Sequence, residues 1–291
     1  MLIGALEGGG TKMVCAVGEE NGRIIDRISI PTRTPEETMP QIIEYFKKHM
    51  VCALGIVCFG PLDLNPTSPT YGYITTTTKA EWRNYNILGT LRDALDVPCG
   101  FDTDVNGAVM GEVAYGCMRR VRNGVYITVG TGIGVGIYSN GALVHGMLHP
   151  EGGHVLVRRH PSDTYAGVCS YHGDCLEGLA SGPAIEERAG CKAYELAPDD
   201  RIWTYESYYL AQAVCNYILT ISPEKIVLGG GVMKQEQLFP MIREDVRRML
   251  AGYIQAPEME DLEHYIVPAS LDDNQGVLGG IRLAYDAAIM S

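Results

Sequence analysis

The chain has 291 residues, an apolar fraction of 46% and a formal net charge of −12. This is the composition of a globular protein of about two domains with a substantial core. The negative charge argues against a nucleic-acid partner, because such proteins neutralise phosphates with basic patches. No segment is long and apolar enough to span a bilayer, so no membrane partner is expected. Residues 1–7 lack the basic segment of a signal peptide, which makes the cytoplasm the expected location.

A hairpin and a helix are predicted at the start of the chain. Residues 2–8 and 13–18 are apolar runs that favour strands, and Asn21-Gly22 predicts a turn into a returning strand over residues 23–30. Thr34-Pro35-Glu36-Glu37 predicts a helix start, with a threonine cap, a proline in the first turn and a capping-box glutamate.

Residues 51–59 form an unbroken apolar run, which is typical of a strand buried on both faces. Cys52 and Cys58 lie in this run, and most of the nine cysteines, from Cys15 to Cys215, lie in similar runs. This pattern indicates free buried thiols in a reducing compartment, not a disulfide framework.

The order of elements at the start of the chain returns in its middle. Residues 124–129 are a predicted strand that ends in Gly130-Thr131-Gly132, continues over residues 135–138 and turns at Asn140-Gly141. Both halves therefore run strand, Gly/Thr turn, strand, Asn-Gly hairpin. We interpret this as a diverged internal duplication of one α/β domain; chance recurrence of short hairpins is the alternative.

The last third has an α/β pattern. Residues 204–220 and 236–251 favour helices, and a short buried strand over residues 225–228 lies between them. A final helix is predicted for residues 275–290.

Three glycine-rich turns follow predicted strands: Gly8-Gly9-Gly10-Thr11-Lys12, Gly130–Gly136 and Gly229-Gly230-Gly231-Val232-Met233. Glycines let backbone N–H groups approach a phosphate, and the last position suits an adenosine. The first turn is not a Walker A loop and could be an ordinary tight hairpin. The second could be a bulged, kinked strand. Three such turns together favour a nucleotide cleft between two domains.

A candidate general base lies in the segment Phe101-Asp102-Thr103-Asp104-Val105-Asn106, at a predicted strand-to-helix junction. An acid here can accept a hydroxyl proton during phosphoryl transfer. Alternatively, Asp102 or Asp104 caps the helix predicted to start near Val105. Gly107 and Ala108 would permit close packing of that helix.

A metal site is indicated by Cys169-x-x-His172-x-x-Cys175, in a stretch that holds five of the seven histidines. Two thiolates and an imidazole at this spacing can bind one tetrahedral Zn²⁺, and four protein ligands would make the site structural. The fourth ligand would be His154 or His160. The alternative is a loop that is merely rich in cysteine and histidine.

Taken together, these motifs resemble the ROK family of sugar kinases over essentially the whole chain. Residues 7–12 are similar to the family's first phosphate loop, usually Asp-x-Gly-Gly-Thr, and residues 130–134 to its second. Asp104 falls where the Asn-Asp-Ala-Asn motif carries the catalytic aspartate. Glu151-Gly152-Gly153-His154 matches Glu-x-Gly-His, and Cys175-Leu176-Glu177 matches the Cys-Leu-Glu that closes the zinc loop.

The resemblance implies an actin-like ATPase fold, which is a duplicated ribonuclease-H-like α/β fold with two domains around a nucleotide cleft. The first domain, residues 1–117 with a C-terminal helix of residues 272–291 returning to it, would hold the sugar and the first phosphate loop. The second, residues 118–271, would hold the second phosphate loop, the zinc loop and the adenosine site. A homodimer is also expected.

The activity implied is transfer of phosphate from ATP to a hexose, with Mg²⁺ accompanying ATP, a structural Zn²⁺ and Asp104 as the catalytic base. The ATP-binding residues implied are Gly9, Gly10, Thr11, Lys12, Thr131, Gly132, Pro183, Gly229, Gly230, Gly231, Val232 and Met233. The sugar-binding residues implied are Gly60, Thr103, Asp104, Glu151, His154 and Glu177. The zinc ligands implied are His154, Cys169, His172 and Cys175.

Departures from the family pattern indicate a subgroup. The zinc loop is usually Cys-x-Cys-Gly-x-x-Gly-Cys, and here it is Cys169-Ser170-Tyr171-His172-Gly173-Asp174-Cys175. This loop, Glu7, Phe59-Gly60-Pro61-Leu62-Asp63 and residues 69–83 are similar to bacterial ROK fructokinases. Thr103 replaces the family's sugar-binding Asn. The expected reaction is therefore fructose to fructose 6-phosphate.

Other sugars and other classes of protein remain as alternatives. Glucose, mannose, N-acetylmannosamine or allose could be the acceptor, or the chain could be a non-catalytic sugar sensor. The family's repressors carry an N-terminal winged helix, for which a phosphate loop that begins at residue 8 leaves no room. A purely structural zinc protein would leave the three glycine-rich turns unexplained.

Overall fold

The computed structural model describes residues 1–290, and in it the chain forms two compact units. Unit 1 consists of residues 1–120, residues 143–150 and the residues from Ser270 onward. Unit 2 consists of residues 121–142 and 151–269. The predicted division placed residues 143–150 in the second domain, whereas in the structure this segment packs with unit 1.

The sheet of unit 1 has the strand order β3-β2-β1-β4-β7. Strand β1 pairs antiparallel with β2 and parallel with β4, and β4 pairs parallel with β7. Its strands are β1 (Ile3–Gly8), β2 (Lys12–Gly18), β3 (Ile24–Pro31), β4 (Leu54–Cys58) and β7 (Cys99–Thr103). The insertion between β4 and β7 carries β5 (Tyr73–Ile74), the 3₁₀ turn η1 (Ala80–Trp82) and β6 (Tyr85–Asn86).

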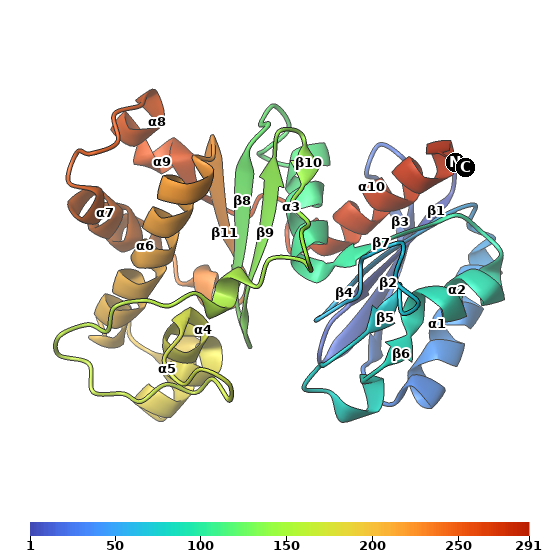
Figure 1. Cartoon of the computed structure of the whole chain (residues 1–291), viewed down its shortest axis with the longest axis horizontal. Coiled ribbons are helices and arrows are strands. Elements are labelled where there is room, and N and C mark those ends of the chain that lie inside the picture. Colours follow the sequence, from blue (N-terminus) through green and yellow to red (C-terminus); the bar gives the residue numbers. More distant parts are fainter. Residues whose placement is uncertain (291) are drawn as a thin grey trace. The chain divides into compact units, whose positions relative to one another are not determined.

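Helices cover both faces of this sheet. Helices α1 (Pro35–His49) and α2 (Ile87–Leu95) pack on one face, where their apolar side chains meet Leu6 and Cys15. Helix α10 (Gln275–Met290) packs on the other face against Ala5 and Val14, beside α3 (Asp104–Ala114) (Figure 1). The two faces follow from the period-2 alternation of side chains along β1 and β2.

Close approach of α3 and α10 depends on small residues. A Cβ added at Gly279 of α10 would lie 1.7 Å from the carbonyl oxygen of Gly107 in α3. The backbones can touch there only because both residues lack side chains. The close packing expected from Gly107 is therefore present, and it fixes the helix whose first residue is Asp104.

The sheet of unit 2 repeats this arrangement. Its order is β10-β9-β8-β11-β12, in which β8 pairs antiparallel with β9 and parallel with β11. β8 corresponds to β1, and β9 to β2, in order and direction, which supports the predicted duplication. The strands are β8 (Gly124–Val129), β9 (Ile133–Ser139), β10 (Ala142–Leu143), β11 (Lys225–Gly229) and β12 (Ile266–Pro268).

The helices of unit 2 include two of the three predicted in the last third of the chain. The longest, α6 (Ile202–Ile221), packs against α7 (Leu238–Leu250) and α4 (Leu176–Ala180). The other helical segments are η2 (Gly152–His154), α5 (Gly182–Ala189), η3 (Ala193–Glu195), η4 (Val232–Lys234), α8 (Pro257–Glu260) and α9 (Leu262–Tyr265). Among the helices of residues 1–290, none is long and apolar enough to cross a membrane.

One predicted local detail was wrong. Helix α1 begins at Pro35 after Thr34, as expected, but the Thr34 side chain makes no capping hydrogen bond. Glu37 instead pairs with Arg33 at 3.1 Å, and the Thr38 hydroxyl accepts the Arg33 N–H at 3.1 Å. The sequence therefore has the capping-box pattern, but the Thr34 side chain does not form the hydrogen bond of that motif.

Candidate functional site

The first glycine-rich turn joins β1 to β2 at the end of the sheet where the parallel strands β4 and β7 also terminate. Gly9 N–H donates to the Lys12 carbonyl at 3.0 Å, which closes a tight hairpin turn. The Thr32 hydroxyl donates to the Gly9 carbonyl at 2.7 Å and holds the turn from outside. Thr11 and Lys12 are exposed, so the hydroxyl and the ammonium group are accessible to a ligand.

Glu7 directly precedes this turn and lies against the start of α10. Burial raises the pKa of the Glu7 carboxyl, and the nearby charges of Arg27 and Lys12 oppose that effect. A Cβ added at Gly276 would lie 2.6 Å from the Glu7 Cδ atom. The glycine therefore makes room for the glutamate. In the sequence Glu7 stands out only as a departure from the family's Asp, and this contact with α10 is visible only in the structure.

Asp104 stands at the predicted junction, as the first residue of α3 after β7 ends at Thr103. The cap of α3 is Thr103, whose side chain accepts the Asn106 N–H at 3.1 Å. The interpretation of Asp102 or Asp104 as the helix cap was therefore wrong. Asp104 is partly exposed and lies in the first turn of the helix, where the helix dipole favours a negative charge.

Asp102 is buried beside it, with a fully partnered carboxylate. Oδ1 accepts the Thr103 N–H at 2.8 Å and the Asn106 side-chain amide at 2.7 Å. Oδ2 lies 2.8 Å from Nε2 of His145. Nothing in the local sequence pattern pointed to His145 as this partner, because the two residues lie 43 positions apart.

Gly60 follows β4 in a loop that faces the segment of residues 143–150. Its peptide bond to Pro61 is cis. His149 is buried there, and its Nε2 accepts the Leu62 N–H at 3.0 Å. A Cβ at Gly60 would lie 3.2 Å from the His149 ring, so the predicted sugar-binding glycine and this histidine are in close contact.

The second glycine-rich turn joins β8 to β9 in unit 2. Gly130 N–H donates to the Gly132 carbonyl at 2.9 Å, and β8 and β9 pair in one continuous register from Gly124 to Val129. The alternative of a bulged strand is therefore wrong, because the glycines form a closed turn. Thr131 is exposed at its tip.

Glu177 and Pro183 lie close to this second turn. Glu177, in α4, accepts the Ile133 N–H at 3.0 Å through Oε2. Gly182 N–H donates to the Gly130 carbonyl at 2.7 Å, which places the first turn of α5, with Pro183, beside the Gly/Thr turn. The structure thus brings together Gly132, Glu177 and Pro183, which are separated in the sequence.

The third turn, Gly229–Met233, ends β11 and continues into η4 before α7 begins. Gly230 has φ = 91°, a conformation that favours glycine, and a Cβ there would lie 2.4 Å from the Val129 carbonyl oxygen. Gly231 is exposed, and nothing lies within 4 Å of where its Cβ would be. Val232 and Met233 are buried.

The structure gathers His154, Cys169, His172 and Cys175, whose ligand atoms all lie within 4.8 Å of one another. Cys169 Sγ lies 3.7 Å from Nδ1 of both histidines, and Cys175 Sγ lies 3.5 Å from Nδ1 of His154. In a tetrahedral zinc site the sulfur–nitrogen separation is about 3.6 Å, given the usual bond lengths. The residues present therefore fit Zn²⁺.

His154 is the histidine that joins this cluster, and His160 is not part of it. The His160 ring packs against Tyr205 and Tyr208, and its Nδ1 accepts the Ser162 N–H at 3.2 Å. Nε2 of His154 lies 3.9 Å from Glu177 Oε1. A carboxylate on the far nitrogen of a ligating histidine is a common support of metal sites. Glu151, which the sequence also predicts to bind the sugar, is exposed, whereas His154 and Glu177 are partly buried.

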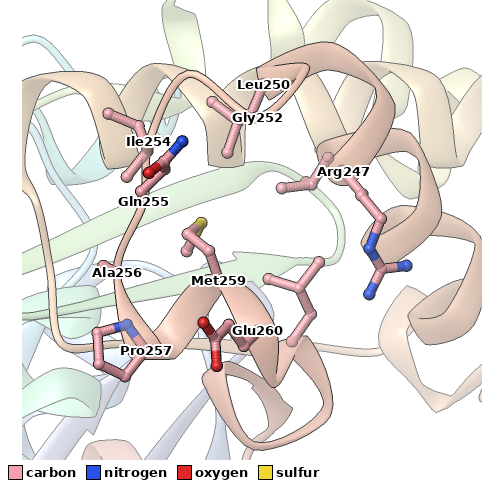
Figure 2. Close-up of a pocket in the computed structure, with 11 residues that line it drawn as sticks. Arg247, Leu250, Gly252, Ile254, Gln255, Ala256, Pro257, Met259 and Glu260 are labelled. Carbon is pink, nitrogen blue, oxygen red and sulfur yellow. The ribbon is translucent and has the colours of Figure 1, made fainter.

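A cavity of about 550 Å³ lies elsewhere in unit 2, between the end of α7 and the α8–α9 segment. Figure 2 shows Met259 near the centre of its lining, with Arg247 and Glu260 as its charged groups. Among the described residues that line it there is no predicted site residue.

Comparison with known proteins identifies the class of this fold. The solved structure of a ROK hexokinase from Thermus thermophilus matches with a TM-score of 0.83 and 25% identity, over 100% of both chains. The fold is the actin-like ATPase fold expected from the sequence. The ROK family model matches residues 3–287, and the chain belongs to that family.

Two relatives are considerably closer in sequence. A fructokinase from Pediococcus pentosaceus is 48% identical over 99% of this chain and 99% of its own length. A fructokinase from Lactococcus lactis subsp. cremoris is 45% identical over 97% of this chain and 96% of its own length. The similarity therefore covers both units and all three glycine-rich turns.

Proposed function

We propose that this protein is an ATP-dependent fructokinase that converts fructose to fructose 6-phosphate. The observation that carries the proposal is full-length similarity, at 48% and 45% identity, to two proteins named fructokinase. The structure supports the proposal in two ways: the carboxyl group of Asp104 lies at the β7–α3 junction, and closed Gly/Thr turns follow β1 and β8.

Asp104 is the catalytic base in this proposal. The 6-hydroxyl oxygen of fructose forms a bond to the γ-phosphorus, and the bond from that phosphorus to the β–γ bridging oxygen breaks. ADP leaves, and the hydroxyl proton passes to the Asp104 carboxylate. Asp104 suits this task because it is partly exposed at a helix start, where the ionised form is favoured.

The glycine-rich turns bind ATP in this proposal. Gly9, Gly10, Thr11 and Lys12, together with Thr131 and Gly132, bind phosphates through backbone N–H groups, hydroxyls and the ammonium group. Mg²⁺ bound to ATP supplies charge neutralisation at the phosphates. Glu7 is the carboxylate assigned to that ion, because it directly precedes the first turn and a bound cation would offset the burial that otherwise raises its carboxyl pKa. The adenosine is assigned to Pro183 and to residues 229–233.

The sugar is assigned to Gly60, Thr103, Asp104, Glu151, His154 and Glu177. Zn²⁺ is assigned to His154, Cys169, His172 and Cys175, as a structural ion with four protein ligands. Through His154, the ion would hold the Glu151–His154 segment in place. The functional domains proposed are residues 1–117 with 272–291, to which the structure adds residues 143–150, and the remainder of residues 118–271. We also propose that the chain forms a homodimer.

A coupled assay tests the reaction. Purified protein with Mg-ATP is given fructose, glucose, mannose, N-acetylmannosamine or allose, and ADP release is followed. Fructose should show the highest kcat/KM, and phosphoglucose isomerase with glucose 6-phosphate dehydrogenase should convert the product with formation of NADPH. A higher kcat/KM for another hexose would contradict the proposed substrate. Absence of ADP release with every sugar would contradict the proposed class of enzyme.

A further inference from the structure

Two histidines of the segment 143–150 bond to the rest of unit 1, and their chemical roles differ. His149 Nε2 accepts the Leu62 N–H, so this nitrogen carries no proton and the ring is neutral. His145 Nε2 lies 2.8 Å from a carboxylate oxygen of Asp102, and because an ionised carboxylate only accepts, this nitrogen carries the proton when Asp102 is ionised. Of the two rings, only that of His145 can be the cation.

Asp102 needs a positive partner because its side chain is only 5% exposed. A buried carboxylate is costly unless it is paired and hydrogen-bonded. Its other two donors, the Thr103 N–H and the Asn106 amide, are neutral. The side chain of His145 is 41% exposed, so the imidazolium keeps part of its hydration while it pairs with Asp102.

The position of this pair connects it with the reaction. Asp102 lies two residues before Asp104, at the same strand-to-helix junction. A second carboxylate charge near a base favours protonation of that base and also repels the phosphates of ATP. A cation paired with Asp102 offsets both effects.

We propose that His145 is a positioning residue that neutralises Asp102 and thereby keeps the base Asp104 ionised. This rests on the proposed function, in which Asp104 accepts the sugar proton. The hydrogen bond to Asp102 also raises the pKa of His145, against the opposing effect of burial. Asp102 and Asn106 face His145, Tyr71 lies near Asp102, and Cys58 lies near Asp104. His149, on the same segment as His145, is instead bonded to Leu62.

The test compares the pH dependence of kcat/KM for fructose in the wild type and in His145→Gln, which keeps a donor but has no charge. The acid limb of this profile, which reports protonation of Asp104, should move to higher pH by roughly half a unit or more. A charge in contact with a group shifts its pKa by about 1 to 3 units, and a more distant charge shifts it less. His149→Gln, which keeps an acceptor for the Leu62 N–H, is the matched control and should not move the limb. An unmoved limb in a folded His145→Gln protein would overturn the proposal.

Asp102→Asn separates charge neutralisation from mere support. It removes the negative charge beside Asp104 and should move the acid limb to lower pH, whereas His145→Gln removes the positive charge and should move it to higher pH. A limb that moves to higher pH in both variants, as loss of mere support would produce, would also overturn the proposal.

A measurement without turnover keeps this inference separate from the proposed function. The imidazole pKa of His145, followed by NMR in the wild type and in Asp102→Asn, should fall when the carboxylate is removed, because the hydrogen bond to Asp102 raises it. An unchanged imidazole pKa would refute the pairing whatever Asp104 does. Undiminished turnover in Asp104→Asn would instead refute the base, with the His145 titration unaffected.

Discussion

Glu177 accepts a hydrogen bond from the Ile133 N–H at 3.0 Å and so joins α4 to the second Gly/Thr turn. The same carboxylate oxygen would lie 2.7 Å from a Cβ at Gly132, so the turn has no space for a side chain there. Glu177 also lies next to His154 of the proposed zinc site. One side chain thus links the proposed phosphate, sugar and metal contacts within unit 2.

We expect Glu177→Ala to raise the KM for ATP by about 10- to 100-fold, because a charge-assisted hydrogen bond contributes about 1.5–3 kcal/mol. Glu177→Gln keeps an acceptor for the Ile133 N–H and should leave the KM for ATP close to wild type, while the KM for fructose rises. Steady-state kinetics with each substrate varied would measure both. An unchanged KM for ATP in Glu177→Ala would show that the hydrogen bond does not support nucleotide binding.

Asp104→Asn should lower kcat by about 10²- to 10⁴-fold, the usual contribution of a general base. The amide keeps the size of the side chain and the start of α3, so stability and nucleotide affinity should stay near wild type. Stopped-flow turnover, together with calorimetric titration of ATP analogue binding, would measure these quantities. A kcat within twofold of wild type would refute the assignment of the base.

Cys169→Ser and Cys175→Ser should each lose zinc, because both thiolates belong to the four-ligand cluster. His160→Gln is the matched control, since His160 packs against tyrosines outside the cluster. Elemental analysis should find about one zinc per chain in the wild type and in His160→Gln, as expected for a single closed site. Full metal content in both cysteine variants would be incompatible with this ligand set.

Gly276→Ala should destabilise unit 1 by about 1–3 kcal/mol, because the new methyl group would overlap the Glu7 carboxyl. Glu7→Asp withdraws that carboxyl, so Gly276→Ala should cost less in the Glu7→Asp background. Urea unfolding of the four proteins gives the coupling between the two sites. Equal costs of Gly276→Ala in both backgrounds would exclude a clash with Glu7.

Stability should depend on pH through Glu7, whose pKa burial raises. A carboxyl group with a raised folded-state pKa stabilises the fold below its unfolded pKa, and this contribution is lost as pH rises through the folded pKa. Relative to Glu7→Gln, the wild type without nucleotide should therefore become less stable as pH rises above about 4.5. Thermal melts of both proteins from pH 4 to pH 8 would test this. A difference in melting temperature between the two proteins that does not change with pH would contradict the expected titration of Glu7.

Much of the fold followed from local patterns in the sequence. The Asn140-Gly141 turn has positive φ at both residues, as its composition predicted. The apolar run 51–59 contains β4, all of which is buried. The Cys169–Cys175 spacing predicted a metal cluster, and the fold brings those ligand atoms together. These features depend on backbone preference and on periodicity, both of which are visible in a short window of residues.

Other features required the tertiary structure. Asp102 and His145 lie 43 residues apart, and the choice of His154 over His160 depends on which ring the fold brings to the two thiols. The cap of α3 is Thr103, whose side chain accepts the Asn106 N–H, while the Asp102 carboxylate is engaged by His145 and the Asn106 amide. The sequence alone determined the residue types, the glycine-rich turns and those strands and helices that have a clear apolar pattern. Only the folded chain decided which distant side chains share a buried charge or a metal site, because burial and distance arise when the elements pack.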